Sequence, residues 1–234
     1  MRWPALARRR QVLLPTWWGL LLLCTLGSAV LVFALARVHD FLTPQAPCGA
    51  DLLVVEGWIE PEGLDQAVEL VRAGRYARVV TAGGPIVGWA DRFGFASFAD
   101  LARDYLVGRG LPAGQVLAAP APASAQKRTF LSAVEVRDRL QAEGLQVDAI
   151  DVFSSGCHAR RTWLLYRMAF GPGVRVGILA ARPEGYDPSA WWRSSDGAKA
   201  VLQELLSLAW TELFFWPGPR GSVDERWAVP GNGR

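Results

Sequence analysis

The chain has 234 residues, and its 25 basic and 22 acidic side chains leave a formal net charge of only +3. Proteins that bind nucleic acid concentrate basic residues on one face, so this small excess argues against nucleic acid as a partner. The three cysteines show no Cys-x-x-Cys or Cys/His spacing for zinc, and the sequence therefore predicts no metal site.

An uncharged apolar segment begins near the N-terminus. Residues 16–36 form a run of about the length that a helix needs to cross the hydrocarbon core of a bilayer. Trp17 and Trp18 stand at its start, where aromatic side chains favour the membrane interface. Four basic residues precede the run, namely Arg2, Arg8, Arg9 and Arg10. The positive-inside rule therefore predicts a cytoplasmic N-terminus and an outward-facing remainder.

A cleaved signal peptide is the alternative interpretation, with an A-x-A site that ends at Ala36. The apolar run exceeds the roughly 7–15 residues of a signal h-region, which favours an uncleaved anchor. We therefore expect a cytoplasmic N-terminus over residues 1–15, a transmembrane helix over 16–36 and a tether over 37–50. Basic residues are almost all arginine, as in GC-rich bacterial genomes, so the expected location is the bacterial cytoplasmic (inner) membrane, single-pass, with the domain facing the periplasm or exterior.

Beyond the tether, short apolar runs alternate with helical patterns, which is typical of parallel strands joined by crossover helices. The expected strands lie near residues 51–57, 76–82, 115–118, 147–153 and 174–179. The expected helices lie near residues 61–74, 96–108, 127–143, 158–170 and 195–215. Together they predict a Rossmann-like, three-layer, doubly wound α/β domain over residues 51–216 with a mainly parallel five-stranded sheet. A flexible tail over residues 217–234 is expected to follow.

Ligands of doubly wound sheets bind beyond the C-terminal ends of the strands, so the loops that follow the strands hold the candidate binding residues. Those residues are Glu56, Gly83, Gly84, Arg128, Thr129, Ser154, Ser155 and Arg161. The two glycines permit a close approach of ligand to backbone, although a plain turn explains them equally well. Thr129 and Arg128 open a helix, where an ordinary cap with an exposed charge is the alternative. No GxGxxG or P-loop is present, so the cofactor is left unknown.

The strongest local pattern is the segment 154–161, in which a strand turns into a helix. The unpaired N–H groups at a helix start attract anions such as phosphate or carboxylate. His158 and Arg161 lie three residues apart and so share one face of that helix. We assign His158 as the candidate catalytic acid/base and Arg161, with Arg128, as the clamp for the anion. A turn histidine beside a solvated arginine is the alternative.

The last predicted helix carries two glutamates, Glu204 and Glu212, which argue against a second membrane span. Glu204 interrupts an apolar helix face, and we expect it to pair with Arg128 or Arg161 as a structural ion pair. Just before this helix, Trp191-Trp192-Arg193 belongs either to the core or to a lid or membrane-facing patch.

The chain resembles the ElyC/SanA/YdcF family (domain of unknown function 218) over residues 50–212. The resemblance rests on a strand ending near Gly57, Thr-Ala-Gly-Gly at 81–84, Arg-Thr-x-x-Ser at 128–132, His-x-x-Arg at 158–161, and the glutamate at 204. It departs at residues 55–58, where Val-Glu-Gly-Trp replaces the glycine-rich end of strand one. The resemblance implies a membrane-anchored role in envelope and cell-wall biogenesis, in some members through the lipid carrier of peptidoglycan synthesis.

The leading hypothesis is an envelope (cell-wall) biogenesis protein that binds an anionic, phosphorylated or lipid-carrier-linked ligand. If it is an enzyme, the expected reaction is phosphate-ester or polyprenyl-phosphate chemistry. The alternative is a non-catalytic module that binds a nucleotide-like ligand or a partner protein of the cell-wall machinery. A methyltransferase is disfavoured, because S-adenosylmethionine is cytoplasmic and strand one lacks a glycine-rich loop.

Overall fold

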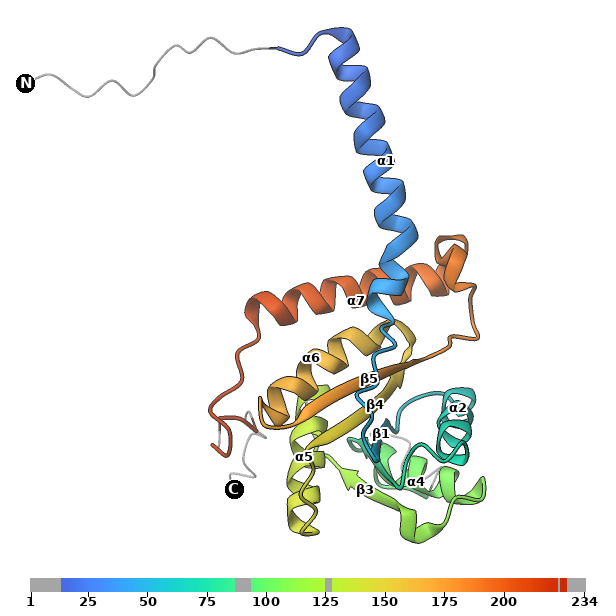
Figure 1. Ribbon diagram of the computed structural model, residues 1–234, viewed down its shortest axis with the longest axis vertical. Helices are drawn as coiled ribbons and strands as arrows, with labels where there is room; N and C mark the ends of the chain where they lie inside the picture. The colour runs from blue at the N-terminus through green and yellow to red at the C-terminus, as the bar shows by residue number, and fades with distance from the viewer. Residues whose placement is uncertain (1–13, 87–93, 125–127, 223, 227–234) are drawn as a thin grey trace, which may run out of the picture. The chain divides into compact units, whose positions relative to one another are not determined.

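The computed structural model describes residues 14–86, 94–124, 128–222 and 224–226 (Figure 1). The chain divides into two compact units, Met1–Val38 and His39–Arg234. Helix α1, Trp17–Leu42, supplies the described part of the first unit and enters the second.

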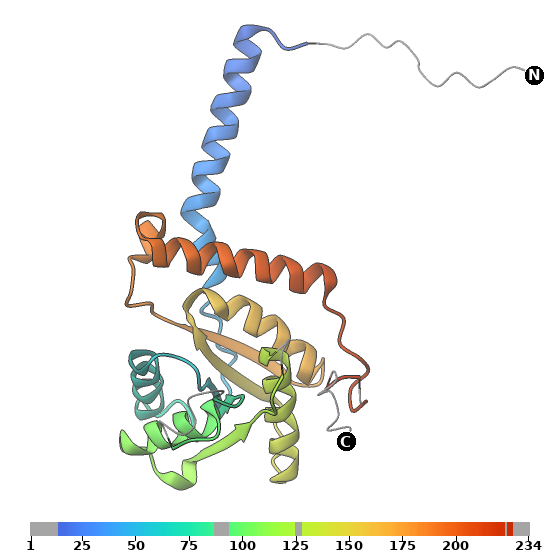
Figure 2. The same cartoon turned by 180° about the vertical axis from the view of Figure 1, so that it is seen from behind.

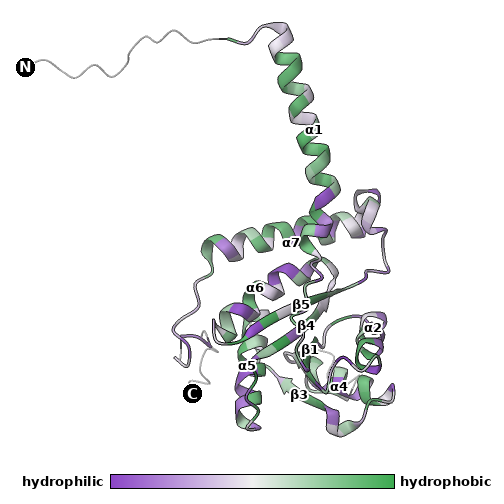
Figure 3. Cartoon of the chain, viewed as in Figure 1, coloured by the Kyte–Doolittle hydropathy of each residue, from purple (hydrophilic) through white to green (hydrophobic). Residues whose placement is uncertain are grey.

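Within the described residues, α1 is the one helix long and apolar enough to cross a membrane, a test that a signal sequence also passes. Hydrophobic residues follow one another along it (Figure 3), and they are exposed on all sides. The hydroxyl of Thr25 donates to the carbonyl of Leu21 at 2.9 Å, so this polar group is satisfied within the helix, as a bilayer would require. The helix runs beyond the predicted end at residue 36, because no proline follows before Pro44.

The second unit contains a five-stranded parallel sheet in the order β3-β2-β1-β4-β5, which confirms the predicted fold class. The strands are β1 Leu52–Glu56, β2 Arg78–Gly83, β3 Val116–Pro120, β4 Ala149–Ser155 and β5 Arg175–Ala181. All five residues of β1 are buried, as expected for the central strand of a sheet that is covered on both faces.

Helices cover both faces of the sheet (Figures 1 and 2). On one face, α2 Pro61–Arg72 and α4 Phe98–Gly108 pack on the β1 side chains Leu53 and Val55. On the other face, α5 Arg128–Ala142 and α6 Ala159–Phe170 pack on Leu52 and Val54. Alternate side chains of β1 therefore enter two separate cores, which makes the unit three-layered. The last helix, α7 Ser195–Phe214, packs against α6 and the short helix η2 Gly156–His158.

The winding direction reverses between β1 and β4. From β1 the chain builds the sheet outward through β2 to β3, and it then crosses over to place β4 on the free side of β1. The loops after β1 and β4 therefore diverge to opposite faces of the sheet. This topological switch point is where doubly wound sheets hold their ligands.

The segment expected to be a tether is partly integrated into the sheet. The backbone of Ala46 pairs antiparallel with Ile178 of β5, with N···O distances of 2.8 and 3.1 Å. The N–H of Cys48 donates to the Asp151 carboxylate at 2.7 Å. The folded unit therefore begins at His39, well before the predicted boundary at residue 51.

The described part of the predicted tail is also held in place. Glu225 is 2% exposed, and both of its carboxylate oxygens bind the guanidinium of Arg137 on α5, at 2.6 and 3.0 Å. The expectation of a flexible tail from residue 217 is therefore wrong for this part, because a charge pair distant in sequence fixes it. Residues 227–234 lie outside the described part of the chain.

We predict that Glu225→Gln lowers the free energy of unfolding by about 2 kcal/mol, because it removes the buried carboxylate that binds two nitrogens of the largely buried Arg137 and leaves that guanidinium with Asp138 alone among the described carboxylates. Glu143→Gln is the matched control, since Glu143 forms a surface pair with Arg139 that is worth well under 1 kcal/mol. Denaturant unfolding of the full chain in detergent measures both changes. Equal stabilities of the two variants would contradict a docked tail.

Candidate functional site

A buried carboxylate lies at the switch point of the sheet. Glu56 ends β1 and is 1% exposed. The hydroxyls of Ser154, at the end of β4, and of Thr162, on α6, hydrogen-bond to Glu56 Oε2, the latter at 3.3 Å. Burying an unpaired carboxylate is costly, and these two hydroxyls offset that cost on one oxygen. The other oxygen, Oε1, lies 3.9 Å from Nε2 of His158 and faces the imidazole.

His158 is fixed by side chains from three other elements. Its Nδ1 lies 3.0 Å from Glu204 Oε1 on α7, and its Nε2 lies 3.3 Å from Thr129 Oγ1 on α5. The ring of Trp58, after β1, meets the imidazole edge to face with centroids 4.9 Å apart. Because His158 is 9% exposed, its ring has little freedom to turn.

Glu204 pairs with Arg161 as well as with His158. Nε of Arg161 donates to Oε2 at 2.9 Å and Nη2 donates to Oε1 at 3.1 Å, so the ion pair is bidentate. Burial raises the pKa of Glu204, but hydrogen bonds from His158 and Arg161, together with their charges, outweigh it and lower the pKa to about 2. The expected ion pair of Glu204 with Arg161 is confirmed, and the carboxylate is ionised at neutral pH.

Nδ1 of His158 has two close polar neighbours of opposite kind. Glu204 Oε1, at 3.0 Å, only accepts hydrogen bonds, whereas Nη2 of Arg161, at 2.8 Å, only donates them. The tautomer with a proton on Nδ1 satisfies the carboxylate and leaves the lone pair on Nε2, which faces Glu56 and Thr129. The opposite tautomer satisfies the guanidinium. A role for His158 as a base at Nε2 requires the first tautomer.

The structure brings five of the predicted residues together in one cluster, which consists of Glu56, Thr129, Ser154, His158 and Arg161. Ser155 ends β4 beside this cluster and is half-buried, whereas Arg128 is exposed at the start of α5. Both stay candidates by position.

The two glycines have different surroundings. A Cβ on Gly83 would lie 2.7 Å from Cβ of Phe98, so the close approach at this position is made by α4. A Cβ on Gly84 would have its nearest neighbours at 4.0 Å, in the carbonyls of Ala121 and Pro122. Helix packing therefore explains Gly83, whereas a side chain at Gly84 would make only ordinary van der Waals contact with the described residues.

Two further residues that contact the cluster were missed from the sequence. Thr162, on α6, follows His158, the residue before that helix, by four positions, and this helical spacing places both side chains on one side. This spacing of four residues can be read from the sequence. Trp58 carried no comparable signal, because its contact with His158 depends on how the loop after β1 turns.

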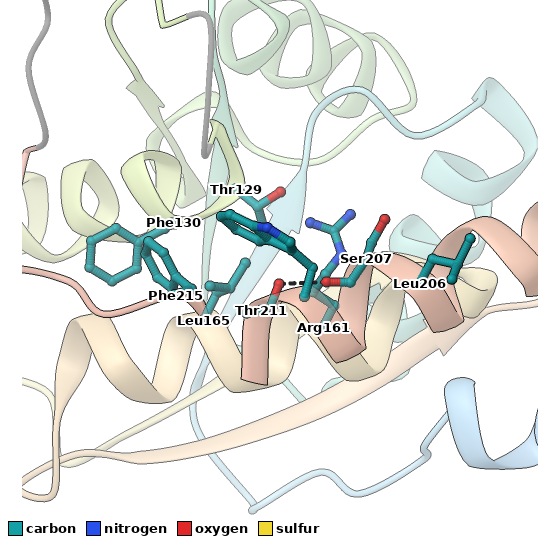
Figure 4. Close-up of a pocket in the computed structure, with 9 residues that line it drawn as sticks. Thr129, Phe130, Arg161, Leu165, Leu206, Ser207, Thr211 and Phe215 are labelled. Atoms are coloured by element: carbon teal, nitrogen blue, oxygen red, sulfur yellow. Dashed lines mark hydrogen bonds between the residues drawn. The ribbon is translucent and has the colours of Figure 1, made fainter. Parts of the chain in front are cut away.

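An apolar groove of about 550 Å³ adjoins the cluster (Figure 4). Thr129 and Arg161 lie at its polar part, and Ser207 and Thr211 add hydroxyls from α7. Its remaining walls are apolar side chains from α5, α6, α7 and the residue that follows α7, namely Phe130, Leu165, Leu206, Trp210 and Phe215. Nη1 of Arg161 makes no hydrogen bond to the described part of the chain, so it is available to a ligand in the groove.

No protein-family model and no curated protein matches this chain. Among the described residues, no three His, Cys, Asp or Glu side chains are grouped so that they could hold a metal ion. The arrangement of the cluster and the groove is therefore the basis for assigning a chemistry to the site.

We predict a pH-dependent loss of stability in Glu204→Gln. The folded-state pKa of about 2 lies below the ordinary value of 4.5, so the ionised carboxylate stabilises the fold above about pH 4.5 and loses this effect as the pH falls toward 2. A shift of this size corresponds to roughly 3 kcal/mol. The variant should be less stable by about that amount at pH 7 and nearly equal to the parent near pH 2.

Denaturant unfolding between pH 2 and 7 measures this difference. Glu212→Gln, an exposed position on the same helix, is the control and should follow the parent chain throughout. A constant gap between Glu204→Gln and the parent at every pH would show that the ion pair does not form.

Proposed function

We propose that this chain is a bacterial membrane-anchored protein of cell-envelope (cell-wall) biogenesis, related to the ElyC/SanA/YdcF family. It binds an anionic, phosphorylated or lipid-carrier-linked ligand at the C-terminal ends of the strands. The observation that carries the proposal is the His158–Glu204–Arg161 cluster, which lies at the switch point of the sheet and adjoins an apolar groove.

The polar and apolar parts of the groove favour an amphiphilic ligand. Nη1 of Arg161 and the hydroxyl of Thr129 offer hydrogen bonds to the oxygens of a phosphate. The aromatic and aliphatic walls suit a hydrocarbon chain, whose burial is favourable in proportion to the apolar area removed from water. The volume lies within the range of pockets that take small organic ligands.

Hydrolysis of a phosphate ester is the reaction that the cluster suits best. Nε2 of His158 takes a proton from water while the water oxygen attacks phosphorus, and the P–O bond to the leaving group breaks. The imidazolium, stabilised by Glu204, then returns the proton to the leaving oxygen. Arg161, aided by Arg128, would hold the phosphoryl oxygens.

Binding without turnover is the alternative, and one observation favours it. The imidazole of His158 is only 9% exposed and already has partners on both nitrogens, as in a structural network. In that case the same residues would bind a nucleotide-like ligand or a partner protein of the cell-wall machinery.

We predict that polyprenyl phosphate stabilises the full-length protein in detergent. Arg161→Ala should weaken binding about tenfold, because a charge-assisted hydrogen bond is worth about 1.5–3 kcal/mol. Arg167→Ala removes an exposed arginine from the same helix and should bind as the parent does. Thermal shift and calorimetric titration, with circular dichroism to verify folding, measure these effects.

The same preparations decide between hydrolysis and binding alone. His158→Gln should abolish release of inorganic phosphate while its affinity stays within about threefold of the parent, since a proton-transfer group typically contributes 100-fold or more to rate. Stabilisation of the parent chain without phosphate release would favour the binding module. No stabilisation by polyprenyl or sugar phosphates would contradict the proposed site.

The proposed topology, with the N-terminus in the cytoplasm, predicts that alkaline phosphatase fused after Arg234 is active in an intact bacterium, because it folds with disulfides only outside the cytoplasm. A β-galactosidase fusion at the same position is the control and should be inactive. The reverse pattern would place the domain in the cytoplasm.

A further inference from the structure

Helix α7 is apolar on two sides, but the folded unit covers only one. Val201 and Leu208 are buried in the unit, with Glu204 on the same side. The opposite side exposes Leu206 by 74% and Leu213 by 65%. Figure 3 shows hydrophobic residues recurring along this helix. An exposed apolar surface of this kind marks an interaction site.

The exposed residues form a continuous stripe. Leu202, Leu206, Trp210 and Leu213 recur at the spacing of one helix face. The exposed Glu212 lies between about a quarter turn and nearly half a turn away from these four residues at 100° per residue. Two exposed tryptophans flank the helix, Trp192 before its start and Trp216 after its end. We call Leu202, Leu206, Trp210 and Leu213 the α7 stripe.

The start of the folded unit and α7 meet the same turn of α6. Nε of Arg160 donates to the carbonyl of Phe41, and its guanidinium lies over the Phe41 ring at 4.0 Å. The next residue, Arg161, binds Glu204 of α7. Only Arg37 and Val38 separate the uncharged apolar run from the first residue of the folded unit, His39. The opening segment of the folded unit, at Phe41, and α7 therefore both contact the first turn of α6.

We propose that the α7 stripe lies in the boundary between headgroups and acyl chains of the bilayer that holds α1. This inference rests on the proposed membrane anchoring. The apolar face and the flanking tryptophans are those of a helix that lies in the plane of a membrane interface. Tethering by so short a connection favours the bilayer over a freely diffusing partner, because the lipid surface is always within reach.

The position of the groove gives this contact a role in ligand access. Leu206 and Trp210 belong to the α7 stripe and also line the groove that contains Arg161. A hydrocarbon chain would therefore pass from the bilayer into the groove along apolar side chains, while its anionic head reaches Arg161. The contact restricts the ligand of the proposed site to lipid-linked anions.

Spin labels on the full-length protein in phosphatidylethanolamine and phosphatidylglycerol liposomes test the contact. The native cysteines are replaced by Cys24→Ala, Cys48→Ala and Cys157→Ala, and one label is attached at Leu202→Cys or Leu213→Cys, neither of which lines the groove. A label at Glu69→Cys, exposed on α2, is the aqueous control. A label at Leu31→Cys reports on the anchor. Thermal unfolding verifies that the cysteine-free chain folds.

Oxygen partitions into hydrocarbon, whereas a polar nickel chelate stays in water. We expect the labels at 202 and 213 to collide with oxygen several-fold more, relative to nickel, than the label at 69. This inference is overturned if the labels at 202 and 213 show the same ratio of oxygen to nickel collisions as the label at 69, while the label at 31 lies in lipid. The proposed anchoring would then still stand. If the label at 31 is also accessible to the nickel chelate, the proposed anchoring fails and this inference fails with it.

Protein occupants of the stripe give a different result. A second copy of the chain would shield both labels from both reagents and add spin–spin coupling between copies. A different protein would shield them without such coupling. Either outcome would overturn the proposed membrane contact.

Discussion

The carboxylate of Glu204 is the interaction on which the candidate site depends. It joins α7 to the first turn of α6 through His158 and Arg161, two residues far from it in sequence. The same two oxygens contact the imidazole and orient the guanidinium. Because α7 also forms one wall of the apolar groove, the pair couples the shape of the groove to the chemistry of the cluster.

Glu56 and Glu204 approach the imidazole from opposite nitrogens, and their environments differ. Glu204 faces a permanent cation, Arg161, whereas Glu56 is held by the neutral hydroxyls of Ser154 and Thr162. This asymmetry gives the two glutamates separate roles, one as the orienting group and one as a neighbour of the reactive nitrogen.

Much of this arrangement follows from local sequence patterns. Apolar runs and helical periodicity place each strand and long helix of the second unit within a few residues, and the switch-point rule brings Glu56 and Ser154 to one edge of the sheet. Contacts distant in sequence follow no such rule. The pairing of Arg137 with Glu225 and the packing of Phe98 on Gly83 exist only in the folded chain. The sequence therefore predicted a flexible tail from residue 217 and an approach of ligand to Gly83.

The bridge between Ala46 and Ile178 has a consequence for biogenesis. It covers β5, an edge strand whose free backbone groups would otherwise offer a template for pairing with another chain. The covering segment is among the first parts of the unit to be synthesised, but its partner strand is the last. The backbone of Ala46 must therefore wait, without its β5 partner, until translation reaches that strand. The junction between the apolar helix and the folded unit is thus among the last parts to form.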